Sequence, residues 1–502
     1  MRGTRITALA ALAMLNVFTL AAAVTVARML PPRLAALHIP IAAAKPVMRA
    51  GAVLTPAGKT TDPPALPTAA GLGALVATTL PDAEVGPQVG VEVADARTGQ
   101  VLYSDNGATL ATPASTTKVA TAVAALALLG PDARFSTSVR QASGGIVLVG
   151  GGDPTLAVND YPSSDYPRPA TLAALAASTA RALKAEGRRS VRLGYDTSLY
   201  SGPGMAPGWS DSDISTGNVT PIVALEADQG RLTPGGALED SDNPVNFTPR
   251  TMDPAGLTAA AFAALLRKDG ITLTSGPSPA TAPASAPTLA SVTSPPLSEI
   301  AEQMLRESNN VVAENLARHV AIATRLPATF AGAADAVRTE LRRLGVTTPI
   351  SLVDGSGLSP EDGIAPETLV RVLEVAARSP RARAAVTGLP VAGFTGTLSA
   401  GHSVFGGVGG AARGVVRAKT GNLTTVATLA GLVYDRSGGL LIFAIMAPRV
   451  PSAAMLQTAA GAIDAAAAGL AACGCKLARG DDPPEPPGCL RRHCAGGDSS
   501  RL

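Results

Sequence analysis

Histidine and aromatic side chains are scarce in this chain of 502 residues, which has four histidines and only 3% Phe, Trp and Tyr. Of the two histidines in the expected folded body, His319 falls in a predicted helix and His402 in a predicted loop. No serine stands in the G-x-S-x-G pattern of a nucleophile elbow. Both histidines are interpreted as structural, which disfavours a Ser–His triad. The missing G-x-S-x-G pattern excludes a nucleophile elbow.

Charge is also sparse and nearly balanced. Charged residues make up 16% of the sequence and the formal net charge is +3, so no concentrated basic face predicts a nucleic-acid partner. Lysine is rare, and two of the seven lysines, Lys118 and Lys419, fall inside motifs described below. A buried lysine can lose its proton and act as a base, which arginine cannot do.

Neither a metal nor an organic cofactor is predicted. A glycine-rich string at 407–412 resembles a dinucleotide fingerprint but precedes an expected strand instead of following one. The cysteines lie in a Pro-rich tail, residues 473–502, with a spacing that fits no common zinc finger, so a zinc site is the less favoured alternative. We expect disulfides, with three possible pairings, among Cys473, Cys475, Cys489 and Cys494.

The N-terminus has the composition of an export segment. Arg2 and Arg5 precede an apolar run that ends at Ala27, so residues 1–27 are predicted to be a signal peptide or a membrane anchor. The sequence leaves cleavage and retention both open. Residues 28–68, rich in Pro and Ala, are expected to form a linker. The protein is therefore predicted to be exported and extracytoplasmic, with membrane contact through this segment if it is uncleaved.

The rest of the chain predicts a layered fold. Hydrophobic residues make up 46% of the sequence, which suffices for a full core. Alternating strands near 89–103 and 415–447 predict an antiparallel sheet, and apolar periodicity predicts helices at 113–129, 297–306, 311–323 and 453–472. Residues 136–296, with short strands and many turns, are interpreted as an inserted domain. The expected fold is α/β (α+β), in which residues 69–135 and 297–472 form an antiparallel sheet flanked by helices.

The first motif is Ser115-Thr116-Thr117-Lys118, at the start of the predicted helix 113–129. Residues three apart share a face of a helix, so Ser115 and Lys118 are expected to be neighbours. A lysine amine can activate a serine hydroxyl if burial or a nearby cation lowers its pKa. An ordinary capped helix would explain this string equally well if it stood alone.

Two further motifs follow in order. Ser308-Asn309-Asn310 lies between two predicted helices, where a hydroxyl can relay a proton and an amide can hold a carbonyl group. Lys419-Thr420-Gly421 ends a predicted edge strand and supplies a positive charge, a hydroxyl donor for a carboxylate, and a glycine that lets a ligand backbone approach. The order and placement of the three strings together predict a serine hydrolase.

These motifs resemble those of penicillin-binding proteins, and the chain is most similar to the low-molecular-mass class C group, the D-alanyl-D-alanine carboxypeptidase/endopeptidases of peptidase family S13. Supporting strings lie at 151–156, 195–203 and 354–358. The resemblance implies a fold like that of the serine β-lactamases, peptidoglycan stem peptides as substrates and β-lactam antibiotics as covalent inhibitors. It also implies a transpeptidase-like domain in the two parts 69–135 and 297–472.

The resemblance further implies a role for each motif residue. Ser115 would be acylated and Lys118 would be the base, with Ser308 and Lys419 in the proton network. Asn310 would hold the peptide, Thr420 and Gly421 would bind it near its terminal carboxylate, and the N–H groups of Ser115 and Asn422 would form an oxyanion hole. Family members commonly have a hydroxyl residue where this chain has Asn422, but a backbone N–H group survives that change.

Two other functions are compatible with some of these features. A serine β-lactamase shares the three motifs, although the length of the chain and its insert favour the peptidase. A non-catalytic wall-binding scaffold would not need Ser115, Lys118 and Lys419 intact. The sequence does not rank carboxypeptidase against endopeptidase activity.

Overall fold

The computed structural model describes residues 66–160, 166–233, 248–399 and 412–473. The predicted export segment, almost all of the predicted linker and tail, and His402 lie outside these residues.

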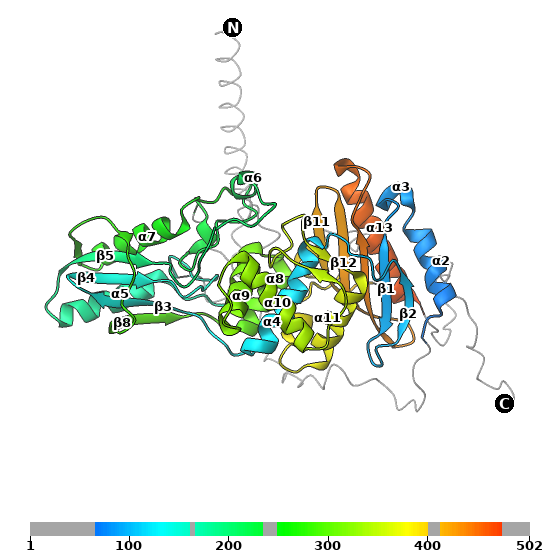
Figure 1. Ribbon diagram of the computed structural model, residues 1–502, viewed down its shortest axis with the longest axis horizontal. Helices are drawn as coiled ribbons and strands as arrows, with labels where there is room; N and C mark the ends of the chain where they lie inside the picture. The colour runs from blue at the N-terminus through cyan, green and yellow to red at the C-terminus, as the bar shows by residue number, and fades with distance from the viewer. Residues whose placement is uncertain (1–65, 161–165, 234–247, 400–411, 474–502) are drawn as a thin grey trace, which may run out of the picture. The chain divides into compact units, whose positions relative to one another are not determined.

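The main sheet has five antiparallel strands in the order β11-β12-β13-β1-β2 (Figure 1). The strands predicted near 89–103 and those predicted near 415–447 join in this one sheet, because β1 pairs with β13. The third motif lies on β11, an edge strand, as the sequence predicts. The strands are β1 Gly90–Asp95, β2 Val101–Asp105, β11 Val416–Leu423, β12 Val426–Tyr434 and β13 Leu440–Ala447.

Helices cover both faces of this sheet and bury two core layers. Successive side chains of a strand point to opposite faces, so in β13 Ile442 and Ala444 join one cluster while Phe443 and Ile445 join the other. The first cluster packs against α4 Thr117–Leu129, α8 Leu297–Glu307, α9 Asn310–Ala323, α10 Phe330–Arg343, α11 Pro366–Arg378 and α12 Ala384–Thr387. The second packs against α2 Ala69–Thr79, α3 Asp82–Val85 and α13 Leu456–Ala472.

Among the described residues, the stretch Ala453–Ala472 is helical and long and apolar enough to cross a membrane by length and composition. It consists of a short 3-10 turn, Ala453–Met455, and α13. Residues of α13 such as Ile463 and Leu470 are buried in the second core cluster, against the sheet and α2. This packing is that of a core helix.

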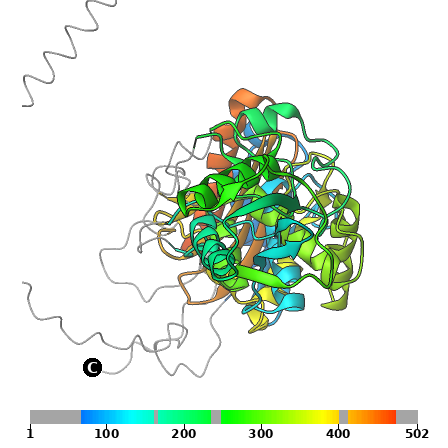
Figure 2. The ribbon, with the colours of Figure 1, turned by 90° about the vertical axis from the view of Figure 1, so that its left-hand side faces the viewer.

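Residues between the first two motifs form a second sheet with its own core, in the order β6-β5-β4-β3-β8, with β7 beside β5. Figure 2 looks onto this part of the chain. The connections from β4 to β5 and from β5 to β6 are parallel crossovers. The elements are β3 Ser136–Ala142, β4 Gly145–Val149, α5 Leu172–Ala185, β5 Ser190–Asp196, α6 Asp211–Ser215, α7 Pro254–Lys268, β6 Thr272–Leu273, β7 Ser278–Pro279 and β8 Thr288–Thr293.

The helices α5 and α7 correct the sequence interpretation of this region, which expected only short strands and turns. Their start signals are present in the sequence. The Thr171 side chain caps α5 by accepting from the Ala174 N–H, and the Asp253 side chain caps α7, which has Pro254 in its first turn. The many glycines and prolines around both helices favoured the prediction of turns in this region.

Candidate active site

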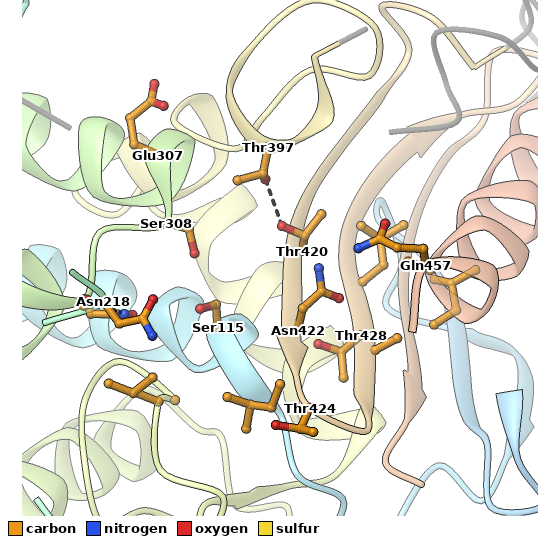
Figure 3. Close-up of a pocket in the computed structure, with 18 of the residues that line it drawn as sticks. Ser115, Asn218, Glu307, Ser308, Thr397, Thr420, Asn422, Thr424, Thr428 and Gln457 are labelled. Atoms are coloured by element: carbon orange, nitrogen blue, oxygen red, sulfur yellow. Dashed lines mark hydrogen bonds between the residues drawn. The ribbon is translucent and has the colours of Figure 1, made fainter. Parts of the chain in front are cut away.

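The three motifs meet at a cleft of about 640 Å³ beside the edge strand β11. Figure 3 shows Ser115 and Ser308 facing Thr420 and Asn422 across this space. Asn310 also lines the cleft, and Asn218 of the inserted region contributes to its wall. Lys118 and Lys419 are fully buried next to it. Segments far apart in sequence thus converge on Ser115.

Ser115 lies in a tight turn that precedes α4. The predicted helix from 113 is wrong in this first turn, because Ala114–Thr116 form a 3-10 turn and the α-helix begins at Thr117. The carbonyl group of Pro113 accepts hydrogen bonds from the hydroxyls of Thr116 at 2.7 Å and Thr428 at 2.8 Å. The turn is therefore tied to strand β12 and holds Ser115 at the rim of the cleft.

Gly421 allows this turn to approach the sheet. A Cβ atom at Gly421 would lie 2.3 Å from the Thr428 hydroxyl, 2.7 Å from the Pro113 oxygen and 3.0 Å from the Ser115 nitrogen. Glycine is needed here for close backbone approach. The sequence analysis predicts that Gly421 lets a ligand backbone approach. The structure shows that it also lets the turn that carries Ser115 approach β11.

Lys118 is held by three oxygen atoms. Its Nζ lies 2.8 Å from Oγ of Ser115, 2.6 Å from Oδ1 of Asn310 and 2.8 Å from the backbone oxygen of Ser356. Amide and backbone carbonyl oxygens can only accept. As an ammonium group Lys118 donates to Oγ of Ser115, whereas a neutral amine at the same distance can accept the proton of the Ser115 hydroxyl. The geometry suits a base poised to take the proton of Ser115.

The second motif links two helices and orients one amide. Ser308 ends α8 in the left-handed conformation, with φ of 61°, and Asn309 caps α9 by accepting from the N–H of Val312 at 3.0 Å. Asn310 is then the first residue of α9, and its Nδ2 donates to the backbone oxygen of Asn218 at 2.9 Å. This bond fixes which end of the amide faces Lys118.

Lys419 brings a second buried amine to the site. Burial and the nearby charge of Lys118 hold the pKa of Lys419 well below its ordinary value, while Glu307 acts in the opposite direction. Its Nζ donates to the backbone oxygen of Thr420 at 2.9 Å, and the Thr420 hydroxyl bonds with that of Thr397 at 2.8 Å (Figure 3). The cleft therefore has lysine amines or hydroxyl donors on both sides of Ser115.

Sequence reasoning missed three contributors to this site: Asn218, Ser356 and Thr397. Asn218 and Ser356 act through backbone oxygens, which carry no residue-type signal. In the sequence, the string at 354–358 is indicated only by the family resemblance. Thr397 is brought to Thr420 by the fold alone.

The other candidate groups lie elsewhere. His319 stacks on Phe135 at a centroid distance of 3.8 Å and its Nε2 lies 2.9 Å from the Gly152 oxygen. Burial lowers the pKa of His319 to about 4, so it stays neutral inside the fold. Within the described ranges no cluster of His, Cys, Asp and Glu could hold a metal ion. Cys473 is disulfide-bonded, and Cys475, Cys489 and Cys494 lie outside the described residues.

A serine beside a buried lysine, with a second buried lysine on the facing edge strand, defines a serine acyl-transfer enzyme of the Ser–Lys type. The model of the D-Ala-D-Ala carboxypeptidase 3 (S13) family matches residues 72–235 and 226–470. The chain belongs to this family, and it is a serine-type D-Ala-D-Ala carboxypeptidase. The predicted family, fold class and enzyme class are confirmed.

Curated relatives span most of the chain. It is 39% identical to carboxypeptidase DacB of Mycolicibacterium smegmatis over 82% of this chain and 85% of that protein. It is 31% identical to the D-alanyl-D-alanine carboxypeptidase of Actinomadura sp. strain R39 over 71% of this chain and 77% of that protein. Because the family acts on the cell wall, the protein is extracytoplasmic.

Solved structures share the fold. Penicillin binding protein 4 of Haemophilus influenzae aligns with a TM-score of 0.59 at 25% identity, over 74% of this chain and 92% of that chain. The same protein in complex with a β-lactam aligns with a TM-score of 0.56 at 24% identity, over 74% and 91% of the two chains.

Proposed function

We propose that this carboxypeptidase shortens peptidoglycan stem peptides through an acyl-enzyme on Ser115. The observation that carries the proposal is the 2.8 Å contact between Nζ of Lys118 and Oγ of Ser115. Nζ also contacts the side-chain carbonyl oxygen of Asn310 and the backbone oxygen of Ser356. The two carbonyl oxygens can only accept from the amine, whereas the serine hydroxyl can donate its proton to the lone pair of the amine.

The reaction has two covalent steps. Oγ of Ser115 attacks the carbonyl carbon between the two D-alanines while its proton passes to Lys118. The C–N bond then breaks as a proton reaches the leaving nitrogen, which gives free D-alanine and an ester on Ser115. Water attacks this ester and releases the shortened peptide, which restores the hydroxyl.

The other motif residues are assigned from their positions in the cleft. The N–H groups of Ser115 and Asn422 stabilise the oxyanion, because both residues line the space that faces the nucleophile. Thr420 and the positive charge near it bind the terminal carboxylate. Asn310 holds the peptide amide, and Ser308 and Lys419 pass the proton to the leaving group. Gly421 keeps β11 close enough to the nucleophile turn for this geometry.

The same serine would be acylated by β-lactams, since their strained amide takes the place of the peptide bond. The β-lactam complex of the Haemophilus influenzae protein supports this expectation for a protein of the same fold. The acyl-enzyme formed from a β-lactam should persist, because the ring nitrogen stays attached and obstructs water.

The test combines a substrate and a covalent probe. The purified protein should release D-alanine from a diacetyl-Lys-D-Ala-D-Ala peptide and form a covalent adduct with a fluorescent penicillin, and Ser115→Ala should do neither. Rapid turnover of a chromogenic cephalosporin without peptide cleavage would contradict the proposal in favour of a β-lactamase. Absence of any adduct on the wild-type protein would favour a scaffold.

We also propose that residues 1–27 direct export and that the protein reaches the membrane through them if they are retained. Their apolar run between arginines supports this. N-terminal sequencing of the mature protein, with alkaline extraction of membranes, separates the two outcomes. A mature chain that starts beyond residue 27 and extracts as a soluble protein contradicts the anchor.

A further inference from the structure

A short loop, Asp354–Ser359, supports the catalytic lysine from behind. Its Ser356 oxygen accepts from Nζ of Lys118 at 2.8 Å, and its Gly355 oxygen accepts from the hydroxyl of Thr121 at 2.6 Å. Lys118 and Thr121 are three residues apart on α4, so two successive carbonyl groups of the loop bind one face of that helix. The position of the loop therefore helps to set where the Lys118 amine lies.

The same loop also touches the nucleophile turn. Gly357 has φ of 77°, and a Cβ there would lie 1.8 Å from the Ala114 oxygen. Only glycine tolerates both the left-handed backbone and this approach. The loop thus contacts the turn that holds Ser115 and the helix that holds Lys118.

The side chain of Asp354 gives the loop its shape. Its Oδ1 accepts from the N–H groups of Ser356 at 3.0 Å and Gly357 at 2.7 Å, and its Oδ2 accepts from the N–H of Ser359 at 2.7 Å. The indole N–H of Trp209, from the inserted region, also donates to Oδ2 at 2.9 Å. Asp354 is 1% exposed, so these four donors take the place of water around a carboxylate.

Two more buried acids hold the ends of the loop. Glu314, one turn after Asn310 on α9, accepts from the Gly355 N–H at 3.0 Å, and Asp362 accepts from the Val353 N–H at 2.7 Å. Burial, together with the charge of Asp354, raises the pKa of Glu314 to about 8 and that of Asp362 to about 10. Both acids therefore retain protons at neutral pH, which avoids three adjacent negative charges.

We propose that Asp354 is a positioning residue for acylation: its carboxylate folds the 354–359 loop so that the Ser356 and Gly355 carbonyls hold α4 with the Lys118 amine aligned on Ser115. Asp354 is not among the residues that line the cleft and acts through backbone carbonyls. This inference rests on the proposed role of Ser115 and Lys118. It assigns a task to the string at 354–358 that the sequence motifs leave without one.

The test is Asp354→Asn in the full chain, which keeps the shape of the side chain but points an NH₂ group at N–H donors. Acylation by the diacetyl-Lys-D-Ala-D-Ala peptide should slow because the lysine is displaced, and misplacement by about 1 Å costs about 100-fold in rate. We expect kcat for D-alanine release to fall by about this factor while KM stays within about threefold, since the binding residues on β11 are untouched. Ser359→Ala is the matched control, because it removes a hydroxyl of the same loop and keeps the N–H that binds Asp354.

Unchanged kcat in a folded Asp354→Asn protein overturns the inference. So does a parallel loss of kcat and substrate binding with a lowered melting temperature, which indicates a structural role only. Should Asp354→Asn fail to fold, Thr121→Val replaces it by removing the hydroxyl that Gly355 accepts from. In Thr121→Val we expect kcat to fall by about 5-fold or more while KM is unchanged. An unchanged kcat in this variant overturns the inference. A wild-type protein that forms no acyl-enzyme refutes the proposed function instead.

Discussion

Oδ1 of Asn310 lies 2.6 Å from Nζ of Lys118, across 192 positions of sequence. The contact joins the first and second motifs directly, and the Nδ2 end of the same amide is fixed by the Asn218 oxygen of the inserted region. Lys118, the proposed base, is therefore oriented by α9 and, through Asn310, by the loop that contains Asn218.

Asn310→Asp should slow acylation by favouring the ammonium form of Lys118. An opposite charge within about 4–6 Å shifts a protonation equilibrium by about 1–3 pH units. We expect the acid limb of the pH profile for fluorescent penicillin labelling to move upward by about that amount, with partial recovery of the rate at higher pH. Asn310→Ala, which adds no charge, should lose rate without moving the limb. A limb that stays in place in Asn310→Asp would contradict the role of Lys118 as base.

Gly421→Ala should damage both activity and stability. Its Cβ would meet the Thr428 hydroxyl, the Pro113 oxygen and the Ser115 nitrogen at 3.0 Å or less, so the nucleophile turn must move. Such overpacking costs about 1–3 kcal/mol of unfolding free energy. Chemical denaturation and D-alanine release measure the two effects. Gly276→Ala is the control, since nothing lies within 4 Å of its added Cβ, and comparable losses there would remove the packing explanation.

Lys419→Met should abolish peptidase activity yet stabilise the fold at neutral pH. Burial and Lys118 lower the pKa of Lys419 in the folded state, so the unfolded chain binds more protons below its ordinary pKa of 10.5. The wild type therefore loses stability as pH falls below 10.5, until the folded pKa is reached. Each pH unit below 10.5, down to the folded pKa, costs the wild type about 1.4 kcal/mol of stability, a cost that Met does not carry. Denaturation of both proteins from pH 7 to 10 should show the advantage of Lys419→Met shrinking as pH rises, and a constant difference would refute this.

His319 should make the fold acid-sensitive. Its pKa is lowered to about 4 by burial, below its ordinary 6.5, so the unfolded chain takes up a proton that the folded chain refuses. The contribution of His319 to the free energy of unfolding is constant above pH 6.5. It falls by about 3 kcal/mol in total as the pH is lowered from 6.5 to 4. Buried acids with raised pKa, such as Asp153 and Glu226, act in the opposite direction. The measurement is therefore the difference in unfolding free energy between wild type and His319→Gln, which should narrow from pH 6.5 to pH 4.

Much of the main domain could be predicted because its elements are locally specified. The predicted bounds agree with the observed ones to within a few residues. This holds for the helices at 297–306 and 311–323, which are α8 and α9, and for the strands near 415–447, which are β11–β13. Their apolar spacing and flanking turns are local signals. The helices α5 and α7 of the insert were missed because glycines and prolines dominate their surroundings, even though Thr171 and Asp253 mark their starts.

The sequence by itself determined which chemistry this protein carries. The i, i+3 spacing of Ser115 and Lys118 is a property of a single helical turn, and the residues matched by the family model include all three motifs. The tertiary structure alone decided how that chemistry is held in place. The contacts of Lys118 with Ser356 and of Asn310 with Asn218 use backbone oxygens, which every residue possesses. Residue identity therefore gives no signal for them, and only long-range packing brings them to the site.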